Sequence, residues 1–563
     1  MIKEKKSKNK VIIATIIIAI IVAVICGILF FSIVNRQERN QNTKLIINYT
    51  DVTNFLKADI FMDENEIVYL SKEDIANFYD EFIYYDEKYN QIITTSNDKI
   101  MIIKLNSDEK EINGVETKLK NKVIKKDNKY FIPFSELEEI YNVKVNYIKE
   151  TNTIVIDSLD RKLTVAESKK KNNLKNNYSI FSKTVEKISE GEKLAIVPLT
   201  DEQRKNIPET WIKVRTEKGN LGYVKKDSIN EEIVIREAEE KTKQIEGKIS
   251  LVWDYFSEYS TAPNRTGTKI EGINVVSPSF FYLEKLGKGN LLENVDNSGK
   301  NYISWAHSNG YKVWPIVSNN SMQETTSEIM NDYELRKKLI NQILEYVKKY
   351  NLDGVNINFE NMKEEDKSLF SRFLIELTPR MKEIGKVVSV DVTEPDGSPE
   401  WSLCFDRNVL GKVVDYMMFM AYDQTGSFST SPGTTAGFNW VNVNVNKFLG
   451  QEEVSKEKLI LGIPFYTRLW KEKDGKVTST VVSMKNIDSQ IPSNASKEWD
   501  ENLKQYYTQF EKDGAVYKMW IEDERSIKEK LSLIKEKDLQ GVCFWVKDFE
   551  KDSVWNIVKE SLE

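Results

Sequence analysis

The sequence has 563 residues, more than one compact core holds, so several domains are expected. Aromatic residues make up 11% of the chain, which excludes a disordered protein. Charged residues make up 30% but leave a net charge of only −6, so no basic field favours nucleic acid as a partner. His307 is the only histidine, which excludes a multi-histidine zinc site, and we expect no cofactor.

The N-terminus has the pattern of a basic tail followed by an apolar segment. Residues 1–10 contain five lysines, and residues 11–34 carry no charge. As a helix the apolar run would be about 36 Å long, enough to cross a bilayer core of about 30 Å. It is longer than the core of a cleaved signal peptide, and no A-x-A site follows it. The sequence predicts a transmembrane helix at 11–34, a cytoplasmic tail at 1–10 and an extracellular C-terminal part at the cell membrane.

Residues 45–160 alternate short β-rich runs with acidic helical stretches, and one pattern occurs twice. Over residues 67–93 and again over 130–156, a strand and a short helix precede a hairpin closed by an Asn-containing turn. The region resembles the copper amine oxidase N-terminal-like domain of bacterial surface proteins. It contains neither His nor Cys, so we expect no copper in it. The resemblance implies a structural or wall-contact role.

A small β unit is expected at residues 165–232. Three short motifs occur in it in order: Gly191-x-x-Leu194, Trp211-x-x-Val214 and Gly222-Tyr223-Val224. This order resembles a bacterial SH3-like barrel, a module that often binds cell-wall glycopeptide. The resemblance implies a second module that contacts the cell wall.

From residue 247 to residue 563, strand-like and helical patterns alternate, which is typical of parallel βα units. Eight predicted strands fit an α/β fold, the (β/α)8 TIM barrel. A small α+β lobe is expected between strands seven and eight, within residues 466–518. The predicted strands are Ile249–Asp254, Gly272–Ser277, Lys312–Val317, Gly354–Glu360, Val387–Val392, Val414–Ala421, Leu459–Pro464 and Gly541–Trp545.

The fourth predicted strand has one polar and one apolar face. Its period of two places Asn356, Asn358 and Glu360 on one side and the intervening apolar residues on the other. A strand buried between helices should be apolar on both faces, so the polar row requires a hydrogen-bond network or a chemical role. The carboxyl ends of the strands form the active site of a TIM barrel, which makes Glu360 a candidate catalytic residue.

Four sequence motifs follow one another in this region. Asp353, Gly354 and Glu360 match the pattern D-G-x-D-x-D-x-E on strand four in register. The other matches are Met420–Asp423 for M-x-Y-D, Leu461–Tyr466 for L-G-I-P-x-Y, and the segment Trp520–Trp545. Residues 247–563 therefore resemble a family-18 glycoside hydrolase of the bacterial spore-cortex and cell-wall type.

The resemblance implies retaining hydrolysis of β-1,4 bonds after N-acetylglucosamine in peptidoglycan, with chitin as the alternative polymer. Glu360 would be the general acid, and the substrate's own acetamido group would be the nucleophile. Tyr422 would hydrogen-bond that acetamido group, and Trp545 would form the floor of the subsite for the reacting sugar. Residues expected around the substrate are Asp423, Trp545, Asn356, Asp391 and Met420.

The sequence departs from the family at Asn356 and Asn358, where the family has Asp. An Asn358 carbonyl can accept a hydrogen bond from the acetamido N–H but supplies no negative charge. Losing one preorganised electrostatic group costs roughly 10²–10³ in rate, and Glu360 would ionise at a lower pH without neighbouring carboxylates. Two interpretations stay open: a slow glycosidase with an acid-shifted optimum, or an inactive glycan-binding or scaffold protein of the cell wall or spore. For Asn356 we expect a role in a core network.

Acidic and aromatic residues at other strand ends are further candidates. Asp254, Asp391 and Glu394 lie at or just past the ends of predicted strands, where acidic residues line a cleft or cap a helix. Asp391 is the strongest of the three. Trp253 and Trp314 are expected to pack in the core rather than bind sugar.

Overall fold

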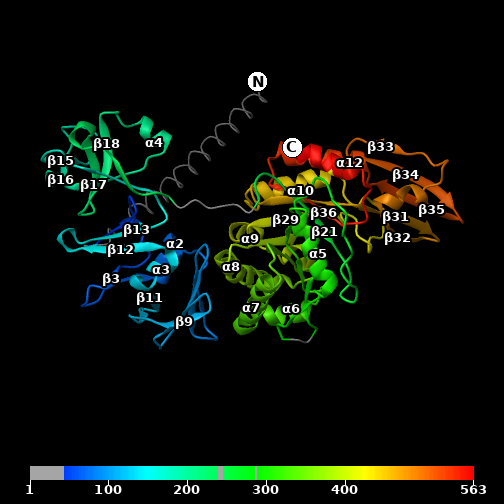
Figure 1. Cartoon of the computed structure of the whole chain (residues 1–563), viewed down its shortest axis with the longest axis horizontal. Coiled ribbons are helices and arrows are strands. Elements are labelled where there is room, and N and C mark those ends of the chain that lie inside the picture. Colours follow the sequence, from blue (N-terminus) through cyan, green and yellow to red (C-terminus); the bar gives the residue numbers. More distant parts are fainter. Residues whose placement is uncertain (1–42, 239–244, 286–287, 563) are drawn as a thin grey trace, which may run out of the picture. The chain divides into compact units, whose positions relative to one another are not determined.

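The computed structural model describes residues 43–238, 245–285 and 288–562 (Figure 1). Contacts divide these residues into two compact units. The first holds residues 43–75 and 123–238, and the second holds residues 76–122 together with the described residues from 245 onward. The module predicted at 45–160 is therefore divided between the two units.

The described part of the chain contains no helix that is long and apolar enough to cross a membrane. Its longest helices, α7 (Tyr333–Lys349) and α8 (Lys367–Glu383), have 17 residues each and carry several charges. A spanning helix needs about 20 apolar residues. This finding corrects the predictions of a membrane location and of the membrane as a partner. The segments on which those predictions rested, 1–10 and 11–34, lie outside the described residues.

Two four-stranded sheets begin the first unit, in the orders β12-β13-β1-β2 and β10-β11-β4-β3. Their strands are β1 (Lys44–Ile47), β2 (Thr50–Asp51), β3 (Phe61–Met62), β4 (Val68–Ser71), β10 (Ile124–Lys126), β11 (Lys129–Pro133), β12 (Val143–Ile148) and β13 (Thr153–Ser158). Short helices connect them: η1 (Thr53–Phe55), α2 (Lys72–Phe78), η2 (Phe134–Glu136), α3 (Glu138–Tyr141) and η3 (Lys149–Thr151). Strands β4 and β11 pair antiparallel, so the two copies of the predicted repeat meet in one sheet.

The predicted repeat of strand, short helix and hairpin is confirmed. The first copy ends in the hairpin of β5 (Tyr84–Asp86) and β6 (Gln91–Thr95), and the second ends in the hairpin of β12 and β13. Asn90 and Asn152 take φ values of 48° in the two hairpin turns, a left-handed conformation that Asn tolerates better than most residues. The second hairpin stays in the first unit, whereas the first hairpin belongs to the second unit.

A seven-stranded antiparallel sheet in the order β16-β15-β19-β18-β17-β14-β20 completes the first unit. Its elements are β14 (Leu163–Glu167), β15 (Asn172–Lys175), β16 (Thr184–Ile188), β17 (Lys193–Ile196), α4 (Asp201–Lys205), β18 (Trp211–Thr216), β19 (Leu221–Lys225), η4 (Lys226–Ser228) and β20 (Ile233–Arg236). A small apolar core that includes Leu174, Leu194, Val214 and Val224 holds it together. The β-rich character agrees with the expectation, and the SH3-like assignment stays a prediction.

Eight parallel strand positions form a closed barrel in the second unit, which confirms the α/β TIM-barrel prediction. Strand β36 pairs in parallel with both β30 and β21, which joins the last strand of the ring to the first. The strands are β21 (Ile249–Asp254), β22 (Val275–Pro278), β25 (Lys312–Val313) with β26 (Ile316–Ser318), β27 (Gly354–Asn358), β28 (Val387–Val392), β29 (Tyr416–Met420), β30 (Leu459–Pro464) and β36 (Gly541–Trp545).

The third barrel strand, predicted as continuous over residues 312–317, is broken in two. Strand β25 pairs with β22, and β26 pairs with β27. Trp314 and Pro315 lie between the two pieces. Proline has no backbone N–H to donate to a ladder, so the strand is interrupted there. An antiparallel pair, β23 (Phe281–Leu283) and β24 (Leu291–Glu293), extends the sheet beside β26.

Helices follow the barrel strands along the chain and share one apolar layer with them. They are α5 (Asn297–Ser308), α6 (Gln323–Met330), α7, η5 (Glu364–Asp366), α8, η6 (Pro399–Leu403), α9 (Arg407–Val413), α10 (Phe438–Gly450), α12 (Glu524–Glu536) and α13 (Val554–Leu562). The layer includes Val355, Ile357 and Phe359 of the fourth strand segment and Leu339 and Phe373 of the helices. The apolar face predicted for that strand segment is therefore confirmed.

A five-stranded antiparallel lobe, in the order β32-β31-β35-β34-β33, is inserted between β30 and β36 (Figure 1). Its elements are β31 (Tyr466–Lys473), β32 (Lys476–Ser483), η7 (Met484–Asn486), α11 (Ile487–Gln490), β33 (Glu498–Asp500), β34 (Gln505–Lys512) and β35 (Ala515–Ile521). The inserted α+β lobe predicted at 466–518 is present and runs three residues further.

A second antiparallel sheet, in the order β5-β6-β7-β8-β9, contacts the barrel helices α7 and α8. Its further strands are β7 (Ile100–Lys104), β8 (Glu109–Ile112) and β9 (Val115–Lys118). Arg336 and Glu376 form a buried ion pair between the two helices, with Nε and Oε2 3.0 Å apart. The Tyr84 hydroxyl donates to Oε1 of Glu376 at 3.2 Å. Arg372 lies 3.8 Å from the centroid of the Tyr84 ring and donates to the Phe82 carbonyl at 2.7 Å.

Candidate active site

The polar row of β27 points into the barrel, where Asn356 has a partner for each polar atom. The indole N–H of Trp253 donates to Oδ1 of Asn356 at 2.7 Å. The amide nitrogen of Asn356 donates to Oγ of Ser389 at 3.0 Å and to Oδ1 of Asp391 at 2.7 Å. Asn356 and Asp391 are both buried. Asn356 therefore lies in the core network that the sequence led us to expect.

Asn358 bridges two carboxyl groups. Its amide nitrogen donates to Oδ2 of Asp391 at 2.9 Å and to Oε1 of Glu360 at 3.2 Å. An amide nitrogen has two hydrogens, and these two contacts use both of them. Asn358 thus links strand β28 to the candidate acid that follows β27.

Glu360 is half-buried two residues past β27, and its backbone is fixed from the third strand. The Glu360 N–H donates to Oδ1 of Asn319 at 3.0 Å, and the Asn319 amide donates to the Glu360 carbonyl at 2.8 Å. Burial raises the pKa of the Glu360 carboxyl, the Asn358 hydrogen bond lowers it, and the charge of Asp423 raises it. The net shift is upward, which favours the protonated form that a proton donor needs.

Tyr422 and Asp423 follow the end of β29. Tyr422 is half-buried, and burial raises the pKa of its phenol well above the usual value, so the hydroxyl stays protonated. Its ring lies 6.2 Å from that of Tyr466, centroid to centroid. Asp423 is exposed and pairs with Arg468, with Nη2 and Oδ1 3.2 Å apart. Tyr466 and Arg468 belong to β31 of the inserted lobe, so the lobe helps to hold this edge of the site.

Trp545 ends β36 and stands between two other aromatic rings. Its centroid lies 5.9 Å from that of the buried Trp253 and 5.9 Å from that of Tyr255, whose side chain is exposed. Met420, Tyr422 and Trp545 pack around one apolar cluster inside the barrel. An apolar platform and a phenol therefore lie beside the polar row.

The carboxyl of Asp391 lies at the centre of these contacts. Its pKa is raised to about 8, because complete burial outweighs the two asparagine hydrogen bonds, and the charge of Glu360 raises it further. The phenol of Tyr422 and the buried thiol of Cys543 interact electrostatically with it. Asp391 thus interacts with ionisable groups on or just after three other strands, β27, β29 and β36.

Other acidic candidates have structural contacts instead. Asp254 receives hydrogen bonds from Arg265 at 2.9 and 3.0 Å and from the Tyr302 hydroxyl at 2.9 Å, so it serves an ion pair. Asp353 starts the strand-four motif but lies at the opposite end of β27, where it accepts from His307 at 2.9 Å. The backbone carbonyl of Glu394 accepts from Arg407 at 2.6 Å, a contact that does not involve the Glu394 carboxyl.

Three residues that contact the site were not singled out from the sequence. Asn319 follows the third strand, and its place at a strand's carboxyl end was a usable signal. Ser389 precedes Asp391 by two residues and therefore faces the same side of β28. Arg468 carried no such signal, because its position depends on how the inserted lobe folds back. Trp253 packs as expected and also donates to Asn356.

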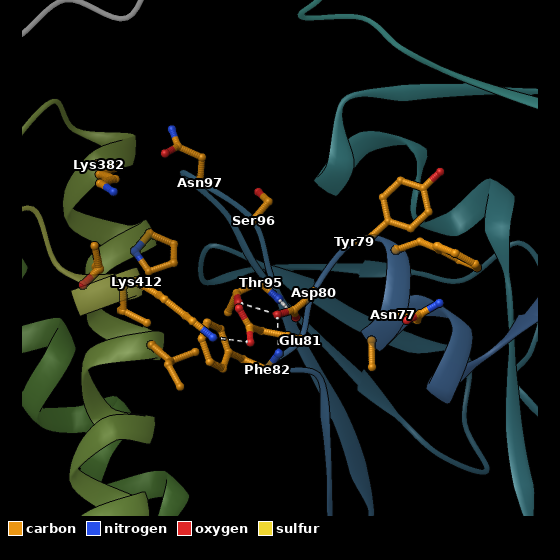
Figure 2. Close-up of a pocket in the computed structure, with 16 residues that line it drawn as sticks. Asn77, Tyr79, Asp80, Glu81, Phe82, Thr95, Ser96, Asn97, Lys382 and Lys412 are labelled. Atoms are coloured by element: carbon orange, nitrogen blue, oxygen red, sulfur yellow. Dashed lines mark hydrogen bonds and ion pairs between the residues drawn. The ribbon is translucent and has the colours of Figure 1, made fainter. Parts of the chain in front are cut away.

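A cavity of about 420 Å³ lies elsewhere in the second unit, between the β5–β9 sheet and helices α8 and α9. Figure 2 shows Lys412 directed toward Glu81, with Nζ and Oε2 2.9 Å apart. The buried Asp80 accepts hydrogen bonds from Thr94 and Thr95 at 2.7 and 2.6 Å. None of the predicted site residues lines this cavity. Within the described ranges, no group of three or more His, Cys, Asp and Glu is arranged to hold a metal ion.

A TIM barrel with a carboxylic acid after strand four, a phenol after strand six and a tryptophan on strand eight defines a class of sugar-cleaving barrel enzymes. Residues 252–550 match the family described as glycosyl hydrolases family 18, and the chain belongs to that family. Residues 46–156 match the family described as copper amine oxidase N-terminal domain. The second match agrees with the resemblance of the predicted module.

Several bacterial proteins are similar to this chain. An uncharacterized glycosylase, YvbX, of Bacillus subtilis is 25% identical over 51% of this chain and 84% of its own length. The putative sporulation-specific glycosylase YdhD of Bacillus subtilis is 28% identical over 48% of this chain and 65% of its own length. The crystal structure of the Bacillus megaterium spore cortex-lytic enzyme SleL is 20% identical, with a TM-score of 0.49 over 59% of this chain and 77% of that one.

Proposed function

We propose that the barrel hydrolyses β-1,4 bonds after N-acetylglucosamine in cell-wall peptidoglycan, with retention at the anomeric carbon. The single observation that carries this proposal is the Glu360 carboxyl, whose pKa is raised by burial and which accepts a hydrogen bond from Asn358. Tyr422 and Trp545 pack around one apolar cluster inside the same barrel. The names of the relatives, sporulation-specific glycosylase and cortical fragment-lytic enzyme, favour cell-wall glycan as the substrate. Chitin is the alternative, and class V chitinases are among the relatives.

In the first step, Glu360 donates its proton to the glycosidic oxygen while the bond from that oxygen to C1 breaks. The acetamido oxygen of the same sugar attacks C1 and forms an oxazolinium ring. In the second step, the Glu360 carboxylate takes a proton from water, and the water oxygen attacks C1 and reopens the ring. Two inversions at C1 give net retention.

The remaining residues orient the acetamido group and the sugar. The Asn358 carbonyl accepts the acetamido N–H, and the Tyr422 hydroxyl donates to the acetamido oxygen. The Trp545 ring stacks under the reacting sugar, a contact suited to an apolar sugar face. Asp423 contacts sugar hydroxyls and raises the pKa of Glu360.

A second candidate function is favoured by Asn356 and Asn358, which stand where the family pattern has Asp. Without those charges the barrel could bind glycan without cleaving it, as a scaffold of the wall or spore. The proposed module boundaries, 45–160, 165–232 and 247–563, suit either role, because the two N-terminal modules would hold the barrel near polymer.

Release of reducing ends from purified peptidoglycan and from chitin separates the two functions. We expect the wild type to release them from peptidoglycan and Glu360→Gln to lose at least about 10²-fold in kcat, the usual contribution of a general acid. Asn358→Asp serves as the matched variant. A wild type without turnover that gains activity in Asn358→Asp would instead establish the scaffold.

A further inference from the structure

The polar network of this site contains one carboxyl group that the family pattern on strand four does not include. Asp391 lies on β28, is 1% exposed, and receives one hydrogen bond on each oxygen. The donors are the amides of Asn356 and Asn358, the two residues that replace aspartates. A carboxyl group is therefore still present next to these positions, but on the neighbouring strand.

The contacts of Asn358 fix which way its amide faces. When Asp391 is ionised and the Glu360 proton is on Oε2, both contacted oxygens are acceptors, so the NH₂ end faces them; a carbonyl oxygen turned that way would meet two acceptors. The NH₂ end accordingly donates to Asp391 and to Glu360. The carbonyl oxygen, the one remaining polar atom of the side chain, is held on the other side as an acceptor.

The Asn356 amide is also held by hydrogen bonds, but it has no carbonyl oxygen left to act as an acceptor for a substrate. Its carbonyl accepts from Trp253, and its NH₂ donates to Ser389 and Asp391. Asn356 therefore donates a hydrogen bond to Asp391, and its polar atoms are all used by protein partners, so none is left for a substrate. The pair of asparagines and one aspartate forms a unit in which the aspartate is the only acceptor common to both amides.

We propose that Asp391 is a positioning residue that replaces the missing strand-four aspartates: acting through Asn358, it aims the amide carbonyl at the substrate's acetamido N–H. This inference rests on the proposed function, because it assumes an N-acetylated sugar beside Glu360. The ionised form of Asp391 accepts both amide hydrogens. A proton on Asp391 would place a donor against the Asn358 amide and favour the flipped, unproductive orientation.

The orientation of the Asn358 amide, and with it turnover, therefore depends on whether Asp391 is ionised. The ionisable groups that face it are Glu360 after β27, Tyr422 after β29 and Cys543 on β36. Burial raises the pKa of Asp391 to about 8, within an accessible assay range. Turnover then requires a proton on Glu360 and none on Asp391, so the acidic limb of the kcat profile would report Asp391.

The test compares Asp391→Asn with the transposed variant Asp391→Asn/Asn358→Asp, which returns one carboxylate to strand β27. We expect kcat on peptidoglycan to fall about 10²-fold in Asp391→Asn, the cost of one preorganised group, with loss of the acidic limb. The transposed variant should regain at least about tenfold. Asp254→Asn is the matched control, a buried aspartate at the end of another barrel strand, β21, and should keep the wild-type pH profile.

Binding of the thiazoline derivative of chitobiose, a stable mimic of the oxazolinium ring, gives a readout that needs no turnover. Calorimetry should show about tenfold weaker binding to Asp391→Asn and recovery in the transposed variant, with unfolding curves confirming that each variant is folded. Wild-type binding and pH profile in Asp391→Asn, or no recovery on transposition, would overturn the inference. A wild type that binds the mimic but releases no reducing ends refutes only the proposed hydrolysis. A wild type that does neither refutes both.

Discussion

Glu360 receives its raised pKa from burial first and from Asp423 second, and not from aspartates on its own strand. The sequence alone suggested that the two asparagines would leave the acid ionised at lower pH. The structure adds burial and Asp423, both of which shift the pKa of Glu360 upward. The pKa of Glu360 is thus raised although the two strand-four positions carry no charge.

Replacing Asp423 tests this account of Glu360. Because the Asp423 charge raises the pKa of Glu360, Asp423→Asn should lower that pKa, and the catalytic acid should be lost at a lower pH. We expect the basic limb of the kcat profile on peptidoglycan to move to lower pH. Asp538→Asn, at an exposed aspartate paired with Lys248 and Lys456, should leave the profile unchanged. A basic limb that does not move would contradict the role given to Asp423.

Tyr422→Phe tests the proposed contact with the acetamido group. The variant removes one hydroxyl that would stabilise the developing ring, so kcat should fall roughly 10–10²-fold while KM changes by less than about threefold. Steady-state kinetics on peptidoglycan measure both constants. Tyr302→Phe is the matched control, since its hydroxyl donates to Asp254 in the ion pair. A rise in KM with unchanged kcat would place Tyr422 in simple binding.

Among the secondary-structure elements, buried parallel strands were the most predictable. The predicted strands at 387–392, 459–464 and 541–545 coincide with β28, β30 and β36. A strand covered on both faces has a nearly continuous apolar sequence, as β30 and β36 do, whereas β28 has Ser389 and Asp391 between apolar residues. The broken third strand was missed because Pro315 sits inside an otherwise apolar run. Most of the site could be predicted for a related reason: alternation within a strand fixes which side chains share a face.

The contacts between the β5–β9 sheet and the helices could not be predicted from pattern. Arg372 and Glu376 are four residues apart on α8, a spacing typical of a solvent-exposed ion pair. In the structure Glu376 is buried against Arg336 and Tyr84. Which charged helix face is covered depends on residues about 290 positions earlier in the chain, and no local period records that.

Breaking the buried pair should cost more than breaking an exposed one. Glu376→Gln leaves the Arg336 guanidinium buried without its counter-charge, so the free energy of unfolding should fall by about 3–5 kcal/mol in urea titrations. Glu81→Gln is the control, because the Glu81–Lys412 pair is roughly half exposed and is expected to cost at most about 1 kcal/mol. Equal decreases in the free energy of unfolding of the two variants would show that the buried pair contributes no more than the exposed one.

At the scale of the whole molecule, the second unit includes 76–122 as well as the barrel. Ile93, Ile100 and Ile102 of the sheet form one buried cluster with Tyr333 of α7. A barrel expressed alone, from residue 245 to the end, would expose Tyr333 and strip the Arg336–Glu376 pair of Tyr84. The barrel is therefore expected to depend on a segment that lies outside its own family match.

Thermal unfolding of two fragments tests that dependence. The fragment 245–563 should unfold at a lower temperature than the fragment 43–563, by about 2–4 °C for each kcal/mol of lost contact. Calorimetry or tryptophan fluorescence would record the transition. The longer fragment serves as the control, since it retains every described residue. Identical transition temperatures would show that the sheet contributes nothing to the barrel.

The divided amine-oxidase-like module has a consequence for how such chains can be rearranged. The chain passes from one unit to the other after Ile75 and returns after Lys122; the described residues up to 238 belong to the first unit and those from 245 to the second. A gene fusion or recombination with its junction between the two regions that match families, 46–156 and 252–550, would take the barrel but leave its β5–β9 sheet behind. We expect the two regions to be inherited together, and a transplanted barrel to need residues 76–122 as part of its own graft.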